Sequence, residues 1–152
     1  MNLDEAPERL RTLPSWLLAQ AALHARREVA SALTGVDGHR SEFAALACLD
    51  EQGPISQVEL AGRIGLDRSD VVRLVDRLAD AGCVVREPDP ADRRRNLLTL
   101  TADGRRRLDE LDERIRGAQA ETLSALTDAE REQLVSLLRS VLGDGGSPRR
   151  AV

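Results

Sequence analysis

Residues 56–100 carry two short capped helices followed directly by two β-like runs, and this order limits the fold more than any other feature. Ser56-Gln57-Val58-Glu59 has the spacing of a capping box, in which two side chains satisfy free backbone donors at a helix start. We therefore predict a helix to about Ile64, a turn at Gly65-Leu66 and a second helix capped by Asp67. The apolar residues of this second helix recur at i, i+3, i+4 and i+7, which predicts one buried face: Val71, Leu74, Val75 and Leu78.

The segment after Gly82 predicts a β-hairpin with a long charged tip. Its β-like runs cover residues 83–86 and 96–100, and the polar residues between them end in Arg93, Arg94 and Arg95. Two helices joined by a glycine-containing turn and followed at once by a hairpin are typical of a winged helix-turn-helix.

Longer helices are predicted on both sides of this unit. Apolar residues recur at helical spacing from Pro14 to near Gly35, and a further helix covers residues 41–52. After the hairpin, Thr101 can cap a helix that runs to about Leu126, and residues 127–130 form a second capping box that opens the last helix. The predicted fold class is therefore mainly α with a small β-hairpin wing, an α+β arrangement.

Composition supports a helical core and excludes several classes of protein. Hydrophobic residues make up 41% of the 152, but there is only one Trp and one Phe, so the core must be Leu, Val and Ala on helices. No stretch approaches the roughly 18 apolar residues of a membrane span, and the acidic start is unlike a secretion signal. We expect a cytoplasmic protein with no membrane partner.

Nothing in the sequence indicates catalysis or a bound cofactor. The chain has no Gly-rich phosphate loop, HExxH or GxSxG motif, and His24 and His39 lie in different predicted elements. Cys48 and Cys83 are far apart and belong to no CxxC or Cys/His group, so neither a disulfide scaffold nor a zinc finger is predicted. We expect no enzyme activity, no cofactor and no metal.

The net charge of −4 argues against a nucleic-acid partner, but the distribution of charge reverses that argument. Residues 55–107 hold eleven arginines against nine acids. The outward face of the second capped helix presents Arg68, Ser69, Val72, Arg73 and Asp76 to the major groove, with Arg68 and Arg73 expected to contact guanine. The alternative is a solvated helix face on which Arg73 and Arg77 pair with nearby aspartates.

The hairpin tip favours the first interpretation. Three consecutive arginines repel one another unless an anion meets them, and a minor groove with its flanking phosphates is a suitable partner. Asp92, two residues before Arg94, is predicted to hold that guanidinium by a short ion pair.

The stretch from Asp67 to Leu78, then Gly82, then Asp89-Pro90-Ala91-Asp92-Arg93-Arg94, then Leu100-Thr101 and Gly104, resembles the recognition helix and wing of the MarR family of transcriptional regulators. The helix order fits from Pro14 to Leu142. The resemblance implies a homodimer that binds a palindromic operator in double-stranded DNA as a repressor, and that a small aromatic or phenolic effector releases. It places Arg94 in the minor groove with Asp92 orienting it, and Ser69 and Arg73 facing the major groove. Asp70 departs from the threonine of many members.

This resemblance implies a division of the chain and a set of site residues. We expect a flexible lead over 1–12, a helical dimerisation region over 13–36 and 101–142, a winged DNA-binding region over 37–100 and a disordered tail over 143–152. The DNA-binding candidates are Ser56, Gln57, Arg68, Ser69, Val72, Arg73, Arg77, Asp92, Arg93, Arg94 and Arg95. The effector candidates are Trp16, Gln20, His24 and Phe43, each with ordinary packing as the alternative.

Three other functions remain open from the sequence. The chain could be a helical dimeric protein-interaction module whose wing has lost DNA binding, which the net charge favours. It could be a regulator that responds to oxidants through Cys48 or Cys83. It could also be a DNA-bridging protein that depends little on operator sequence.

Overall fold

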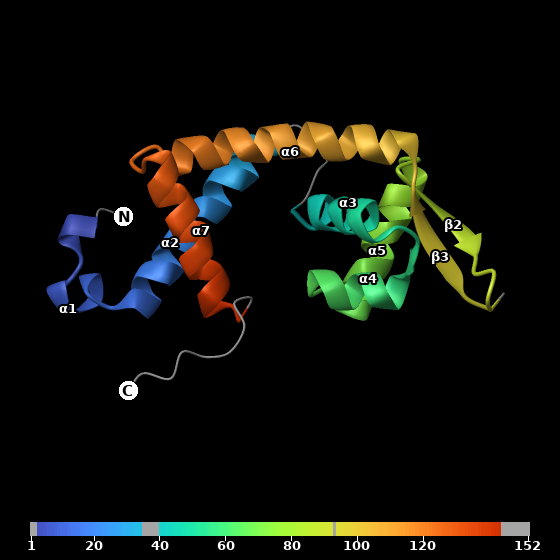
Figure 1. Cartoon of the computed structure of the whole chain (residues 1–152), viewed down its shortest axis with the longest axis horizontal. Helices are drawn as coiled ribbons and strands as arrows, with labels where there is room; N and C mark the ends of the chain where they lie inside the picture. The colour runs from blue at the N-terminus through green and yellow to red at the C-terminus, as the bar shows by residue number, and fades with distance from the viewer. Residues whose placement is uncertain (1–2, 35–39, 93, 144–152) are drawn as a thin grey trace.

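The computed structural model describes residues 3–34, 40–92 and 94–143, and it contains two groups of elements joined by one long helix (Figure 1). The joining helix, α6 (Ala102–Thr122), runs along the top of the molecule in Figure 1. One group, which we call the helical end, consists of α1 (Glu8–Arg11), α2 (Pro14–Ala32) and α7 (Asp128–Val141). The other group, which we call the winged lobe, consists of α3 (Arg40–Gln52), α4 (Gln57–Ile64), α5 (Arg68–Asp80) and a small sheet.

The sheet of the winged lobe has three antiparallel strands in the order β1-β3-β2. They are β1 (Ile55–Ser56), β2 (Val84–Pro88) and β3 (Asn96–Leu100). Val84 lies opposite Leu100 and Ile55 lies opposite Leu98. The predicted fold class, mainly helical with a hairpin wing, is confirmed. Strand β1 was not predicted, because two residues become a strand only when another strand supplies the backbone partners.

The predicted helix starts are present as hydrogen-bonded caps. Ser56 and Thr127 each form a capping box with the glutamate three residues later, and Asp67 caps α5 by accepting from two backbone N–H groups. Gly65 ends α4 at a φ of 67°, a left-handed conformation that glycine adopts without steric cost. These local signals confirm the predicted helix-turn-helix.

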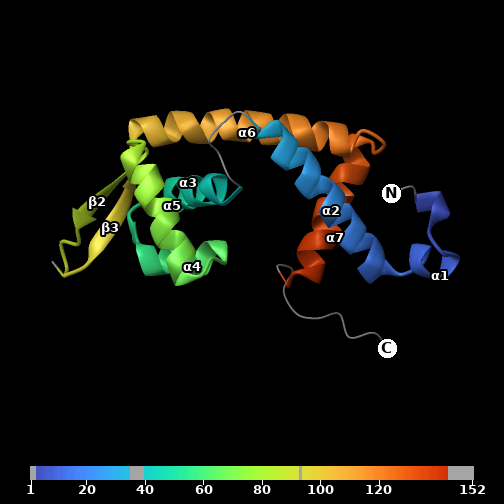
Figure 2. The same ribbon diagram turned by 180° about the vertical axis from the view of Figure 1, so that it is seen from behind.

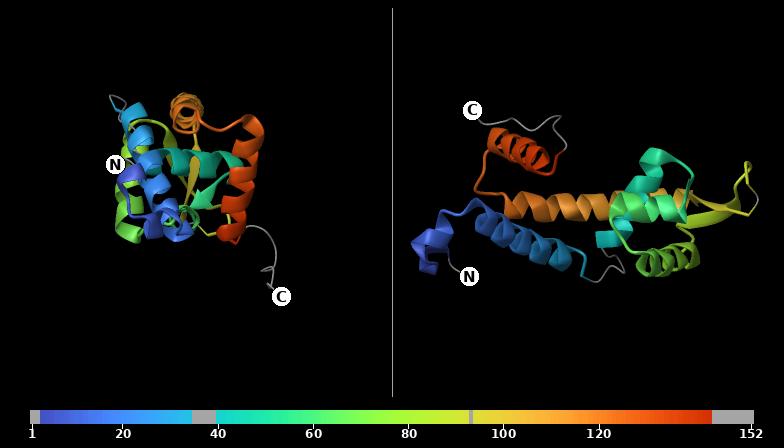
Figure 3. Two further views of the ribbon diagram at one scale, coloured as in Figure 1. Left: turned by 90° about the vertical axis from the view of Figure 1, so that its left-hand side faces the viewer. Right: turned by 90° about the horizontal axis from the view of Figure 1, so that it is seen from below.

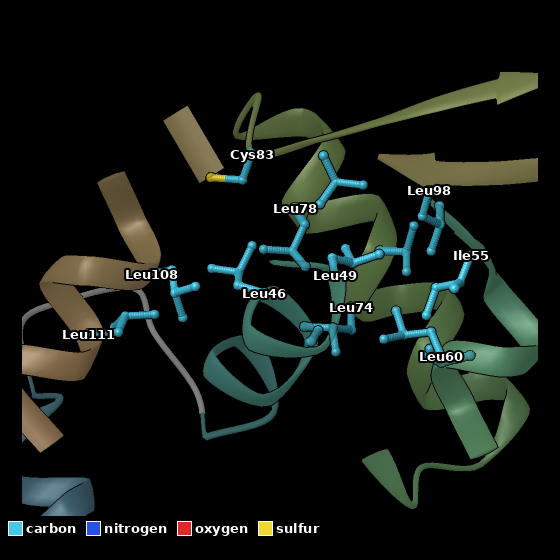
Figure 4. Packing of buried hydrophobic residues seen from close by; sticks show 14 of the residues in the cluster. Leu46, Leu49, Ile55, Leu60, Leu74, Leu78, Cys83, Leu98, Leu108 and Leu111 are labelled. Carbon is cyan, nitrogen blue, oxygen red and sulfur yellow. The ribbon is translucent and has the colours of Figure 1, made fainter. Parts of the chain in front are cut away.

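The hydrophobic core lies mainly in the winged lobe and extends onto the first half of α6. The predicted inner face of α5 is buried, with each of its four apolar residues at most 2% exposed. Figure 4 shows Leu46 and Leu49 of α3 among these side chains, with Leu108 and Leu111 of α6 approaching from the other side. Neither α2 nor α7 contributes a buried residue. The two groups of elements are therefore packed very differently.

The joint between the winged lobe and α6 depends on a close backbone approach. Thr101 caps α6, donates its hydroxyl to the carbonyl of Gly82 at 2.7 Å and donates its backbone N–H to the carbonyl of Cys83 at 3.1 Å. A Cβ atom added to Gly104 would lie 2.1 Å from the Cys83 carbonyl oxygen. Glycine at position 104 is therefore what lets the start of α6 sit directly on the chain leaving α5.

Two ion pairs also connect α3 to α6. Arg107 donates to Glu42 at 2.9 Å, and Glu42 is the buried member, with its side chain 9% exposed. Burial by itself lowers the pKa of Arg107, but the hydrogen bonds and negative charges of Glu42 and Glu110 together more than offset this, and the pKa lies above its ordinary value. Arg105 pairs with Asp50 at 2.5 Å nearer the solvent.

Two of the sequence predictions differ from the structure in their bounds, and two others lie outside the described residues. A flexible lead was expected over residues 1–12, but Leu3–Glu5 forms a 3-10 turn and α1 follows Pro7, with Glu8 in its first turn where the helix dipole favours an acid. Helix α6 ends at Thr122, not near Leu126, because the chain turns to meet the Thr127 cap. The predicted tail lies, apart from Gly143, outside the described residues, as does the predicted boundary at residues 36–37.

Candidate nucleic-acid interface

Helix α5 has one face in the core and an opposite face in solvent. The side chains predicted to face outward are all exposed: Arg68, Ser69, Val72, Arg73 and Asp76. Arg77, a further DNA-binding candidate on this helix, is exposed as well. The N-terminal end of α5 and the tip of the β2–β3 hairpin lie on the side of the winged lobe that faces away from α6 (Figure 1). This arrangement presents a helix and a wing on one side of the molecule, as groove binding requires.

Several polar groups on the outward face of α5 already have partners within the protein. The Asp67 carboxylate accepts from the backbone N–H of Asp70 at 2.9 Å and from the Ser69 hydroxyl at 2.8 Å, and these hydrogen bonds lower the pKa of Asp67. Arg73 pairs with Asp70 at 3.4 Å, and Asp76 pairs with Arg86 of β2. The predicted alternative, pairing of arginines with nearby aspartates, therefore holds for Arg73.

Three predicted DNA-binding arginines have no such partner in the part of the chain that the structure describes. They are Arg68 and Arg77 on α5 and Arg94 at the wing tip, and all three are exposed. Arg95 lies at the limit of ion pairing, 4.0 Å from Glu59 of α4. Arg93 lies outside the described residues. The unpaired guanidinium groups leave positive charge available to an external anion.

Asp92 does not hold Arg94 in the way that the sequence suggested. Its carboxylate accepts the backbone N–H of Arg94 at 3.0 Å, and its carbonyl accepts the backbone N–H of Arg95 at 2.9 Å. The predicted ion pair to the Arg94 guanidinium is absent from the described residues, because the Asp92 carboxylate is engaged with the backbone of the turn that it forms. Asp92 thus shapes the tip through the backbone.

The start of α4 leaves fewer polar groups available for DNA contact than the sequence predicted. Ser56 is 6% exposed, and its hydroxyl both donates to Glu59 at 2.6 Å and accepts the Glu59 backbone N–H at 3.3 Å. Hydrogen bonds from the Ser56 side chain and backbone lower the pKa of Glu59. The Ser56 hydroxyl is therefore engaged in capping, while Gln57 is half-buried at the first position of α4.

Two contacts of the wing were not predicted. Arg86 joins β2 to α5 through Asp76, and Arg95 joins the wing tip to α4 through Glu59. Both pairs connect residues far apart in sequence, and no local spacing identifies them. The Arg86–Asp76 pair connects β2 to α5, whereas the Arg95–Glu59 pair is more than half exposed and contributes little.

The effector candidates lie on two elements. Trp16, Gln20 and His24 are spaced one turn apart on α2, where the first two are half-buried and His24 is exposed, 3.9 Å from Glu28. Phe43 lies on α3 and packs against the core of the winged lobe. Figure 2, seen from behind, shows α2 crossing beside α6 at the helical end, away from the main part of α3.

Neither cysteine has the environment of a reactive thiol. Burial raises the pKa of Cys48, and burial with the nearby Glu42 carboxylate raises the pKa of Cys83. A raised pKa disfavours the thiolate, which is the reactive form. These surroundings weigh against regulation by oxidation.

A metal site and a membrane-spanning helix each have requirements with which the described ranges can be compared. Residues 3–34, 40–92 and 94–143 bring together no group of three or more His, Cys, Asp or Glu side chains that could hold a metal ion. None of the helices within these ranges combines the length and apolar character needed to cross a membrane.

Comparisons with known proteins agree with this geometry. Residues 39–95 match the model of the MarR family. A putative transcriptional regulatory protein for the hcr operon of Thauera aromatica is 30% identical over 123 residues, which cover 80% of this chain and 74% of that protein.

Two solved structures share the fold over most of their length. BpsR of Bordetella bronchiseptica, whose DNA binding is regulated by 6-hydroxynicotinic acid, is 28% identical with a TM-score of 0.76, covering 90% of this chain and 97% of that one. The transcriptional repressor CouR bound to a 23-mer DNA duplex is 26% identical with a TM-score of 0.80, covering 89% and 96%. The family model, the sequence relative and the shared winged-helix fold lead to one conclusion: this chain belongs to the MarR family of transcriptional regulators, which are not enzymes.

Proposed function

We propose that this regulator is a repressor that binds a palindromic operator as a homodimer and is released by a small aromatic effector. Helix α5 enters the major groove and the wing tip reaches the adjacent minor groove. Base contacts from α5 select the sequence, and phosphate contacts from the arginines supply most of the affinity.

The observation that carries this proposal is the set of exposed, unpaired arginines at positions 68, 77 and 94. By contrast, Arg73 and Arg86 of the winged lobe and Arg105 and Arg107 of α6 all have carboxylate partners. An arginine left without a carboxylate, on the side that a groove-binding helix and wing both face, is suited to phosphate. The exposed Arg73–Asp70 pair is worth only about 0–1 kcal/mol, so DNA can compete for that guanidinium as well.

The helical end supports the homodimer. Leu137 and Val141 of α7 are 57% and 69% exposed, and Leu18 and Leu23 of α2 are 40% and 45% exposed. Seen from below, α2 and α7 lie on opposite sides of α6 (Figure 3). Exposed apolar side chains on two helices that flank α6 are typical of a protein interface, and a second copy offers the same surfaces in return. A two-fold dimer positions two α5 helices for two symmetric half-sites, about 10 base pairs apart.

The operator can be found by selecting duplexes from a randomised pool with the purified protein and sequencing them. We expect a palindrome, bound with an affinity that falls steeply as salt rises because phosphate neutralisation releases counterions. Arg94→Ala should weaken binding by about 1–3 kcal/mol per half-site. It should also lower the slope of log affinity against log salt by about 1 for each phosphate that the Arg94 guanidinium neutralises.

Arg116→Ala is a matched control for the loss of one positive charge. Arg116 lies on α6, is 76% exposed and pairs with Asp112 at 2.6 Å, so its removal should leave DNA affinity nearly unchanged. Equal reductions of affinity in the two variants, or no enriched sequence with wild-type protein, would contradict the proposed DNA contact. The second result would leave a helical protein-interaction module as the better interpretation.

The effector site can be tested through the single tryptophan of the chain. Trp16 lies on α2, so quenching of its fluorescence by 6-hydroxynicotinic acid, the compound that regulates BpsR, would report binding near this helix. Gln20→Ala should weaken that binding and the accompanying release from operator DNA. An unchanged affinity in this variant would remove Gln20 from the site.

A further inference from the structure

Val72 is an apolar side chain on the polar, solvent-facing side of α5. It is 41% exposed, whereas Val71, Leu74 and Val75 of the same helix are at most 2% exposed. The core is complete without Val72, and valine is a weaker helix former than alanine or the straight-chain residues. Its two methyl groups therefore contribute little to folding and remain available for contact with a ligand.

Two of the polar neighbours of Val72 along the helix are already engaged. One turn before it, the Ser69 hydroxyl donates to Asp67 at 2.8 Å. One turn after it, Asp76 pairs with Arg86 of the wing strand β2. This edge of α5 thus offers an apolar contact bounded by two polar groups that already have partners.

The chemistry of the major groove limits what Val72 can meet there. Base edges present hydrogen-bond donors and acceptors at every pair, and the one apolar group among the four standard bases is the C5-methyl of thymine. Val72 is the fifth residue of α5, within the N-terminal half that reaches base edges.

We propose that Val72 reads a thymine by contact with its C5-methyl group, so that each operator half-site carries a T·A pair at the position facing Val72. This inference rests on the proposed DNA-binding function and adds one specificity-determining residue to it. The thymine lies beside the base or phosphate that Arg73, the next residue of the helix, contacts.

Deoxyuridine differs from thymidine only by that methyl group and supplies the test. Each thymine of the selected operator is replaced by deoxyuridine, at symmetric positions of both half-sites, and the affinity of the full-length protein is measured. We expect deoxyuridine at one position to weaken binding by about fourfold per half-site, which is the loss of affinity expected when one buried methyl-sized group is removed. Deoxyuridine at the other positions should change the affinity little.

Protein variants connect that position to Val72. Val72→Ala should abolish the difference between thymine and uracil, whereas Val72→Thr, which keeps one methyl group, should preserve part of it. Val85→Ala is the matched control, because Val85 is equally exposed at 42% but lies on β2, and it should leave the full difference. Both valines are exposed, so the melting temperatures should stay close to wild type.

The outcomes separate this inference from the proposed function. A palindrome that binds tightly but contains no uracil-sensitive thymine overturns the Val72 contact and leaves DNA binding intact. A sensitive thymine whose effect persists in Val72→Ala assigns the methyl to another residue and also overturns it. Failure of wild-type protein to bind any duplex overturns both.

Discussion

The winged lobe and the helical end are built from similar amounts of helix but are stabilised differently. Helix α5 buries four apolar side chains and packs against α3, α4 and β2, whereas α2 and α7 together have no buried residue. The winged lobe can therefore stabilise itself through its own contacts. The helical end exposes leucines and valines that only another surface can cover, so its stability is expected to depend on protein concentration.

The largest expected effect is at the link between these regions. Arg107→Met leaves the Glu42 carboxylate buried between α3 and α6 without its partner, and should lower the free energy of unfolding by about 3–5 kcal/mol in chemical denaturation at neutral pH. Adding Glu42→Gln to the same chain removes the stranded charge and should restore much of the stability. A single variant as stable as wild type would show that α6 does not depend on this pair.

The next effect compares equal truncations in the two regions. Leu74→Ala opens a cavity in the winged core, where Leu74 is 2% exposed, and should cost about 2–5 kcal/mol. Leu137→Ala, at a residue 57% exposed in the single chain, should cost little at high dilution but weaken self-association in analytical ultracentrifugation. If Leu137→Ala destabilises the dilute protein as much as Leu74→Ala does, the helical end is as well packed in the single chain as the winged lobe, which would contradict this comparison.

Two glycines on α6 give a smaller effect with opposite signs. Gly104→Ala forces a Cβ against the Cys83 carbonyl and should lower the unfolding free energy by about 1–3 kcal/mol. A Cβ atom added at Gly117 lies within 4 Å of nothing in the single chain, so Gly117→Ala should raise the unfolding free energy by about 1 kcal/mol through better helix propensity. Thermal unfolding of both variants checks this, and destabilisation by Gly117→Ala would indicate that a second copy packs closely there.

The smallest effect is shared by both regions, because each uses carboxylates as helix caps. Hydrogen bonds lower the pKa values of Glu59 and Asp67 in the winged lobe and of Glu130 in the helical end. A carboxyl whose folded pKa is lowered contributes stability above its unfolded pKa and loses it as pH falls through the folded value. Stability should therefore decline below about pH 4–5.

Asp67→Asn isolates one of these caps. Asparagine keeps an acceptor at the N-cap but does not titrate, so the variant should remain folded at neutral pH and show a shallower decline of stability in acid. Denaturation curves measured across this range check the slope. A slope identical to that of wild type would exclude Asp67 from the acid response.

Features that depend on near neighbours could be predicted from the sequence. The capping boxes at Ser56 and Thr127, the turn at Gly65 and the buried stripe of α5 each follow from residues within one or two turns of one another. The resemblance of residues 67–104 to the MarR family follows from the same local patterns. These elements are confirmed because a helix start or an amphipathic face is determined by short-range hydrogen bonding and periodicity.

Features that join distant residues were decided only by the tertiary structure. Strand β1 exists because β3 pairs with it, the wing pairs with α5 through Arg86–Asp76 and with α4 through Arg95–Glu59, and Gly104 is required because the Cys83 carbonyl lies against it. The predicted ion pair between Asp92 and the Arg94 guanidinium was wrong. A carboxylate two residues before an arginine can reach either the backbone N–H or the guanidinium of that arginine, and in the hairpin turn it accepts from the backbone N–H. The sequence by itself therefore determined the main helices, their caps and the family. The folded chain decided which arginines have a carboxylate partner and which do not, because ion pairing depends on positions that only packing brings together.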